Sequence, residues 1–169
     1  MVKITVETYK SDKYYPKVVR AVAAILAKGD VVAPVEVFVQ MDLLSKADVE
    51  SWRFRRLPYL ERAIRCSLGK ASRILRILRM HAHDLNMRPS GTAYVSWGKG
   101  ARTPLRFSKT GAPGLEKAYS LHFLAPNRRP RSKHPAQGEA EASDHGTPVS
   151  SVQVTEVAAP ELSEEAEGH

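Results

Sequence analysis

Apolar residues in the first half of the chain recur every three or four positions, which is the period of an α-helix. Pro16 suits the first position of a helix, and Gly29 suits the position after its end. Pro34 begins a second short helix, for which a strand is the alternative because the segment is rich in valine. Gly69 is expected to separate the last two helices. The pattern predicts five helices, over residues 16–28, 34–41, 46–54, 58–66 and 70–85.

Other segments alternate apolar and polar residues, which is the pattern of a half-buried β-strand. Val2–Val6 predicts a short first strand. Residues 92–97 and 104–108 predict the two strands of a hairpin, joined by a turn over 98–103. A last helix is predicted over 114–123. The predicted fold class is therefore α+β.

The apolar periodicity ends near residue 125. Residues 128–133 are a basic run that contains proline, and residues 137–169 are rich in Glu, Ala, Ser, Pro and Gly without an aromatic residue. Such a segment cannot bury enough apolar surface to offset the entropy lost on ordering it. We therefore expect one domain over 1–124 and a disordered tail over 125–169, first basic and then acidic.

The charges of the chain divide unevenly. Residues 1–136 hold all 26 Lys and Arg and ten of the 18 acidic residues, which gives a net charge of +16. Residues 137–169 hold the other eight acidic residues and no Lys or Arg, which gives −8. A strongly basic domain with an acidic tail predicts a polyanionic partner, such as nucleic acid or an anionic membrane surface.

Several classes of protein do not fit this sequence. The single cysteine, Cys66, excludes a scaffold held by internal disulfides. We expect no transmembrane segment, because no apolar run reaches the roughly 18 residues that one requires, and no signal peptide. His81 and His83 lie about 200° apart on a helix and do not share a metal ion. We therefore expect a cytoplasmic protein without a metal, a cofactor or a catalytic site.

The strongest chemical signal is the density of basic residues between Trp52 and Arg79, where Glu61 is the only acid. Arginine, which predominates there, binds phosphate through two parallel N–H groups and stacks on bases. On the predicted helix 70–85 the arginines lie opposite the apolar face, for which a solvated surface is the alternative. The candidate phosphate-binding residues of this stretch are Arg53, Arg55, Arg56, Arg62, Arg65, Lys70, Arg73, Arg76 and Arg79.

Residues 34–54 have the proportions of a helix-turn-helix, with Ser45 and Asp48 as the cap of its second helix. Ser45 and Lys46 would then lie near a major groove, and an ordinary helix pair is the alternative. Helices followed by a basic hairpin resemble the winged-helix arrangement, which implies that the hairpin contacts phosphates. The candidate residues of the hairpin are Lys99, Arg102, Arg106 and Lys109.

Aromatic residues interleave with these cations, either to stack on single-stranded bases or to pack in the core. They are Trp52, Tyr59, Tyr94, Trp97 and Phe107. Together the features predict a non-catalytic nucleic-acid-binding protein of helix-turn-helix or winged-helix type. Only the helix-turn-helix resemblance favours DNA over RNA. The alternatives are an adaptor that docks an acidic protein partner and, third, a protein that binds a membrane surface.

Overall fold

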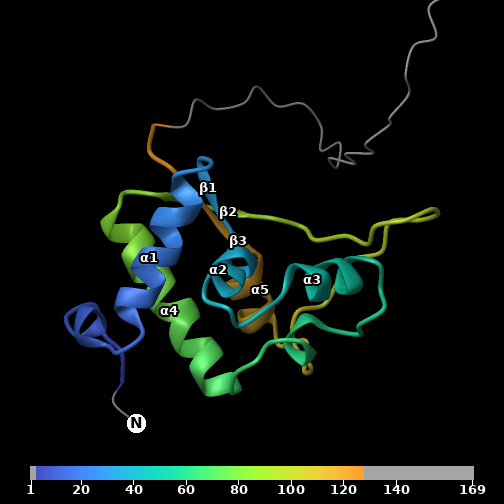
Figure 1. Cartoon of the computed structure of the whole chain (residues 1–169), viewed down its shortest axis with the longest axis horizontal. Coiled ribbons are helices and arrows are strands. Elements are labelled where there is room, and N and C mark those ends of the chain that lie inside the picture. The colour runs from blue at the N-terminus through green and yellow to red at the C-terminus, as the bar shows by residue number, and fades with distance from the viewer. Residues whose placement is uncertain (1–2, 128–169) are drawn as a thin grey trace, which may run out of the picture. The chain divides into compact units, whose positions relative to one another are not determined.

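The computed structural model describes residues 3–127 of the chain (Figure 1). Within this range the α-helices are α1 (Tyr15–Leu26), α2 (Pro34–Gln40), α3 (Lys46–Arg53), α4 (Leu68–Asp84) and α5 (Pro113–Ser120). Two short 3₁₀ helices are η1 (Tyr9–Ser11) and η2 (Leu60–Arg62). The strands β1 (Val31–Val32), β2 (Arg88–Gly91) and β3 (Leu121–Leu124) form an antiparallel sheet in the order β1-β3-β2.

This mixture of helices with a small sheet confirms the predicted α+β class, whereas the winged-helix arrangement is not confirmed. The long helix α4 stands between α3 and the second strand, and the central strand β3 comes last, after α5. The tail predicted for 125–169 lies, from residue 128 on, outside the described residues. Its disorder therefore stays a prediction.

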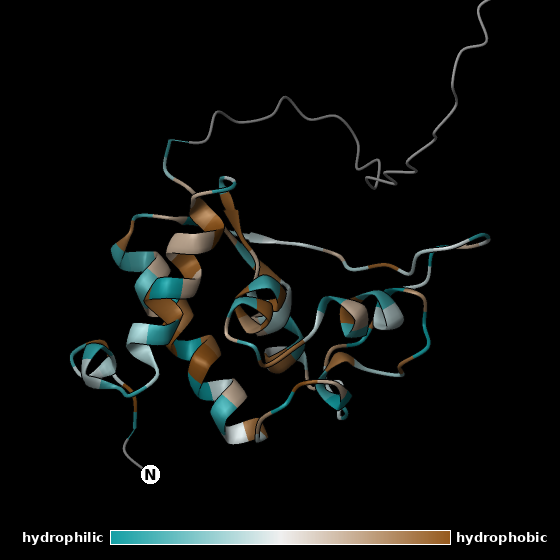
Figure 2. Cartoon of the chain, viewed as in Figure 1, coloured by the Kyte–Doolittle hydropathy of each residue, from teal (hydrophilic) through white to brown (hydrophobic). Residues whose placement is uncertain are grey.

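The core lies where the helices and the sheet meet. Helix α1 packs against α2 and α4, and α5 packs against α2 and α4 in turn. Val18 of α1 and Ile74 and Ile77 of α4 are fully buried. Figure 2 shows hydrophobic residues concentrated on α1, α2, α4 and the strands β1 and β3. His81 also lies in this core, 8% exposed, with its ring edge-on to Tyr15.

The predicted turn between α2 and α3 is present and takes its shape from Asp42, whose φ is 57°. The Leu43 N–H donates to the Phe38 carbonyl over 3.0 Å, which closes the end of α2. Asp is one of the few residues other than Gly that adopt this left-handed conformation readily. The Ser45 hydroxyl accepts from the Asp48 N–H at 3.0 Å, so the predicted cap of α3 is confirmed.

The strand predicted for Val2–Val6 is wrong over its described part. The Thr5 carbonyl accepts hydrogen bonds from the N–H groups of Thr8 and Tyr9, and the Thr5 N–H donates to the Thr8 hydroxyl. These short-range hydrogen bonds turn the chain into η1, so residues 3–6 do not pair with another strand. Val6 is consequently 71% exposed.

The helix predicted for 58–66 is also wrong, because only η2 forms there. The N–H groups of Leu60 and Glu61 donate to the carbonyls of Arg106 and Phe107, and the Arg65 N–H donates to Leu43. Tertiary bonds have replaced the i→i−4 bonds of a helix. Gly69 does not separate two helices, since α4 begins before it at Leu68 with Ser67 as its cap.

The predicted hairpin forms an irregular arm over residues 92–108, which we call the arm. Its two sides share one isolated bridge, Val95 with Pro104, supported by backbone bonds from Ser96 to Thr103 and from Leu105 to Tyr94. Proline has no N–H to extend the ladder. The regular strand β2 precedes the arm and pairs with β3. The predicted helix 114–123 is therefore wrong in its last three residues, because α5 ends at Ser120 and residues 121–123 belong to β3.

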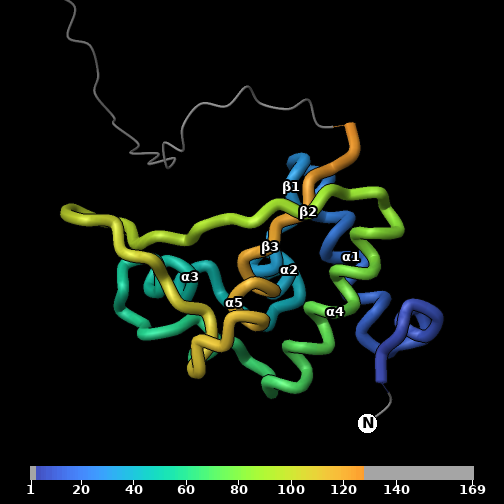
Figure 3. Tube along the Cα trace, turned by 180° about the vertical axis from the view of Figure 1, so that it is seen from behind, coloured from blue at the N-terminus to red at the C-terminus, as the bar shows by residue number. Residues whose placement is uncertain are grey.

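Trp52 holds the arm against the helices. Its side chain is fully buried at the end of α3, and its Nε1–H donates to the Arg106 carbonyl over 2.9 Å. The ring packs against Tyr94 and Phe107 of the arm, with centroids 5.5 and 5.0 Å away. Phe107 stacks in turn on Tyr119 of α5 at 5.5 Å. In Figures 1 and 3 the arm extends from β2 alongside α3, away from α1 and α4.

We expect Trp52→Phe to lower the free energy of unfolding by about 1–3 kcal/mol, because it removes a buried hydrogen bond and leaves a cavity. The matched control is Trp97→Phe, the same substitution at a side chain that is 46% exposed, which should change stability by less than about 0.5 kcal/mol. Urea unfolding followed by far-ultraviolet circular dichroism measures both. Equal losses in the two variants would contradict the anchoring role of Trp52.

Candidate nucleic-acid interface

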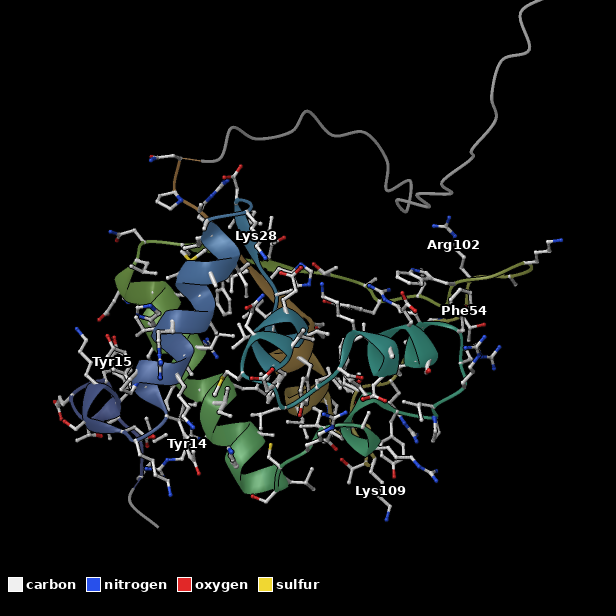
Figure 4. All side chains as sticks on the ribbon, viewed as in Figure 1. Tyr14, Tyr15, Lys28, Phe54, Arg102 and Lys109 are labelled. Carbon is white, nitrogen blue, oxygen red and sulfur yellow. The ribbon has the colours of Figure 1, made fainter. Side chains whose placement is uncertain are left out.

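The fold distributes the predicted phosphate-binding residues over separate surfaces. One surface lies where the end of α3 meets the arm, one surrounds η2, and one follows α4. In Figure 4 Phe54 and Arg102 lie at the arm, Lys109 lies near η2, and Tyr14 lies beside α4. Tertiary structure therefore divides the basic residues of the stretch 53–79 among these three surfaces.

The first surface, which we call the arm surface, joins the residues after α3 to the tip of the arm. Phe54 and Trp97 meet edge to face with ring centroids 5.8 Å apart. The Arg56 guanidinium lies 5.4 Å from the Phe54 ring, and the Arg55 Nη1 makes a long 3.5 Å hydrogen bond to Thr103 Oγ1. Its members are Phe54, Arg55, Arg56, Trp97, Lys99 and Arg102, each of them exposed.

Arg55 occupies a strained backbone position on this surface, with φ of 60°. Its N–H donates to Trp52 and the Arg56 N–H donates to Ser51, which is the Schellman arrangement that ends a helix. Glycine is the usual residue there, because a side chain costs energy in the left-handed region. An arginine at this position therefore costs conformational free energy. Strained backbone positions are common at functional sites, so the strain is compatible with a role for the Arg55 side chain.

Arg53 differs from the other candidates because its side chain is half-buried. The guanidinium lies 4.3 Å from the Tyr94 ring centroid and 5.2 Å from that of Trp97, and Nη1 donates to the Val95 carbonyl. Burial lowers the pKa of Arg53. Among the described residues its Nε has no hydrogen-bond partner. Arg53 therefore supports the arm, and its guanidinium is less accessible than those of the exposed candidates.

The second surface lies around η2. The Arg106 guanidinium is 5.9 Å from the Tyr59 ring, and the Lys109 N–H donates to the Glu61 carboxylate at 3.1 Å. Arg62 is exposed on η2 itself. Glu61 is the one acidic residue of the basic stretch, so it reduces the positive potential here.

The third surface is an open groove of about 1030 Å³ between the N-terminal segment and α4. Arg73 forms an ion pair with Asp12, whose side chain is 2% exposed. Lys70 lies 5.2 Å from the Tyr14 ring. Arg76 lines the groove and is exposed. Because Arg73 compensates a buried carboxylate, its charge stabilises the fold.

The predicted base-reading end of α3 is largely occupied by its own cap. The Ser45 hydroxyl both accepts from the Asp48 N–H and lies 2.6 Å from the Asp48 carboxylate. Arg65 pairs with the same carboxylate at 3.6 Å. Lys46 is exposed at the start of α3. Of the predicted pair, Lys46 is therefore the side chain available to a ligand.

Phe54 is the member of the arm surface that the sequence did not reveal. It is the last residue of the predicted helix 46–54, a position that suggested only the helix end. Its neighbour Trp97 is far away along the chain, and their contact follows from a backbone hydrogen bond of 2.7 Å from the Trp97 N–H to the Arg53 carbonyl. The run Arg53–Arg56, with one aromatic among three arginines, was the signal that could have indicated it.

Two negative findings concern residues 3–127 only. No group of three or more His, Cys, Asp or Glu is placed to hold a metal ion there. Within the same range, the helices are too short or too polar to cross a membrane. Comparisons with protein-family models, with curated proteins and with solved structures found no match to this chain.

His122 of β3 connects the sheet to the arm, because its Nε2 lies 2.7 Å from the Tyr94 hydroxyl. Burial lowers the pKa of His122, and the nearby charge of Arg53 lowers it further. Burial also lowers the pKa of His81. In the unfolded chain both would titrate near 6.5. The unfolded state therefore binds more protons than the folded state as the pH falls through this value.

We expect the free energy of unfolding to decrease as the pH falls from about 7.5 to about 5.5. His122→Gln keeps a hydrogen-bonding partner for Tyr94 but does not titrate, so its stability should depend less steeply on pH. Urea titrations at several pH values measure the two slopes. A variant slope equal to that of the unmodified chain would show that His122 does not contribute.

Proposed function

We propose that this chain is a non-catalytic nucleic-acid-binding protein and that the arm surface holds phosphates. The observation that supports this proposal is a concentration of uncompensated charge. The arm surface has four cations, Arg55, Arg56, Lys99 and Arg102, and no acid among its members, and Glu36 and Glu50 line the pocket that Trp97 also lines. Among the described residues, the ion pairs involve Lys10, Arg65, Arg73 and His83, all of them elsewhere.

A surface on which cations outnumber carboxylates attracts polyanions over a Debye length and releases their counterions on contact. Phosphate contacts give affinity and register without sequence information. The α2–turn–α3 unit has the proportions of a helix-turn-helix, which supports a preference for DNA over RNA. Lys46 is the cation of this unit that is available to a ligand. A cytoplasmic location stays a prediction.

The second candidate function is an adaptor that docks an acidic protein partner on the same cations. The two functions differ in what survives nuclease. Affinity capture of the full chain with and without nuclease treatment separates them, because a protein partner remains bound and a nucleic-acid bridge is lost.

We expect Arg55→Glu combined with Arg102→Glu to weaken binding of duplex DNA about 10-fold or more at low salt. The slope of log K against log salt should become shallower by roughly 0.9 for each phosphate contact removed. The matched control is Arg76→Glu combined with Arg79→Glu, an equal charge change at two exposed positions of α4. Fluorescence anisotropy at several salt concentrations measures all three proteins.

The control decides between the surfaces. A larger loss in the α4 variant would place the phosphates on α4 and contradict the role of the arm. Equal losses would mean that net charge alone governs binding. No binding of the unmodified chain to duplex DNA, single-stranded DNA or duplex RNA would end the nucleic-acid proposal.

Arg55→Gly should change stability and binding in opposite directions. Relief of the left-handed backbone should raise the free energy of unfolding by about 0.5–1 kcal/mol. Loss of one phosphate contact should weaken DNA binding and reduce the salt slope by about 0.9. Urea unfolding and anisotropy measure the two effects.

Asn86→Gly is the control for this variant, because Asn86 also has a positive φ, 55°, and is exposed after α4. It should relieve a smaller strain, since Asn tolerates this region, and leave binding unchanged. If Arg55→Gly binds DNA as tightly as the unmodified chain, the side chain of Arg55 does not contact the ligand.

A further inference from the structure

The arm surface exposes two aromatic rings that the fold does not require for packing. Phe54 is 45% and Trp97 46% exposed, and all the other Phe, Trp and Tyr residues within 3–127 are buried or half-buried. Their neighbours on the arm, Tyr94 and Phe107, are buried. Exposed rings of this size cost hydrophobic free energy unless a ligand covers them.

The two rings are held in fixed positions. The Trp97 backbone is bonded to Arg53 over 2.7 Å, and the Phe54 N–H donates to Glu50 over 2.8 Å. Gly98 has a φ of 109°, and a Cβ placed there would come into van der Waals contact with the Phe54 ring at 3.8 Å, so Gly98 lies beside this ring. The guanidinium of Arg53 supports Trp97 from the half-buried side. The two rings are nearly perpendicular, so a base stacks on the face of one ring or the other, and little side-chain entropy is lost when it does.

Four cations border the rings, and two carboxylates, Glu36 and Glu50, line the pocket that Trp97 also lines. Arg56 lies over Phe54, Arg55 is its chain neighbour, and Lys99 and Arg102 follow Trp97 on the arm. Aromatic rings bordered by cations bind single-stranded nucleic acid, because each base offers a flat face and each nucleotide a phosphate. In a duplex the base faces are stacked on one another and are not available to a protein ring.

We propose that Phe54 and Trp97 form a stacking platform for unpaired bases, with the strand's phosphates held by Arg55, Arg56, Lys99 and Arg102. This inference rests on the proposed nucleic-acid function and narrows its ligand to single-stranded DNA or RNA. Charge complementarity favours this ligand over a neutral apolar partner, and the exposed rings favour it over a purely anionic one.

The fluorescence of tryptophan reports the contact directly. Trp52 is fully buried and Trp97 is exposed, so stacking of a base should quench Trp97 and leave Trp52 unchanged. We would titrate the full chain with oligothymidylate of roughly 15 nucleotides, with a duplex of the same length, and with polyglutamate as an anion without bases. Trp97→Phe should abolish most of the quenching.

We expect Phe54→Ala combined with Trp97→Ala to weaken binding of oligothymidylate about 10-fold or more and to change duplex binding less than about twofold. The matched control is Leu68→Ala, which shortens another exposed apolar side chain, 57% exposed, and should change neither affinity. Far-ultraviolet circular dichroism of each variant establishes that it is folded.

Three results would overturn this inference while leaving the proposed function intact. They are oligothymidylate binding without quenching of Trp97, equal losses of single-strand and duplex binding in the double variant, and quenching by polyglutamate as strong as by oligothymidylate. The failure of every nucleic acid to bind would overturn both the inference and the proposed function.

Discussion

The burial of Trp52 is the interaction on which the arm and its surface depend. The arm has a single β-bridge, so its own backbone bonds cannot hold its two sides against the domain. The indole ring supplies the missing contacts, because it packs on Tyr94 and Phe107 and bonds to the Arg106 carbonyl. Glu116 also holds the arm, since its carboxylate accepts hydrogen bonds from the N–H groups of Phe107 and Ser108. Helix ends therefore position an otherwise irregular segment.

This anchoring also determines which positive charges are available to a ligand. On α4 the fold places Arg73 against the buried Asp12, and near α3 it places Arg65 against Asp48, so these charges stabilise the protein. At the arm surface Arg55, Arg56, Lys99 and Arg102 take part in none of the ion pairs found within residues 3–127. Cations without partners repel one another, and that cost is offset when a polyanion binds. The distribution thus separates structural arginines from candidate binding arginines.

Local signals in the sequence predicted the helices well. Pro34, the Ser45 cap and the periodic apolar residues of α1 and α4 act within one or two turns, so neighbouring residues contain the information. The predictions for Val2–Val6 and 58–66 were wrong because the backbone N–H groups there bond to other acceptors. The Thr5 N–H donates to the Thr8 hydroxyl, and those of Leu60 and Glu61 donate to carbonyls of the arm. The strand β3 was missed because its pairing partners, β1 and β2, lie far away in the chain.

The sequence by itself determined the α+β class, the starts of α2 and α3 and the excess of positive charge in residues 1–136, since each follows from composition or short-range pattern. Only the tertiary structure decided that the basic stretch divides into separate surfaces and that Phe54 lies beside Trp97. The physical reason is that a side chain's exposure and its partners depend on packing between distant segments. A helical period assigns a face to a residue such as Arg73, but it does not reveal that Asp12 will occupy that face.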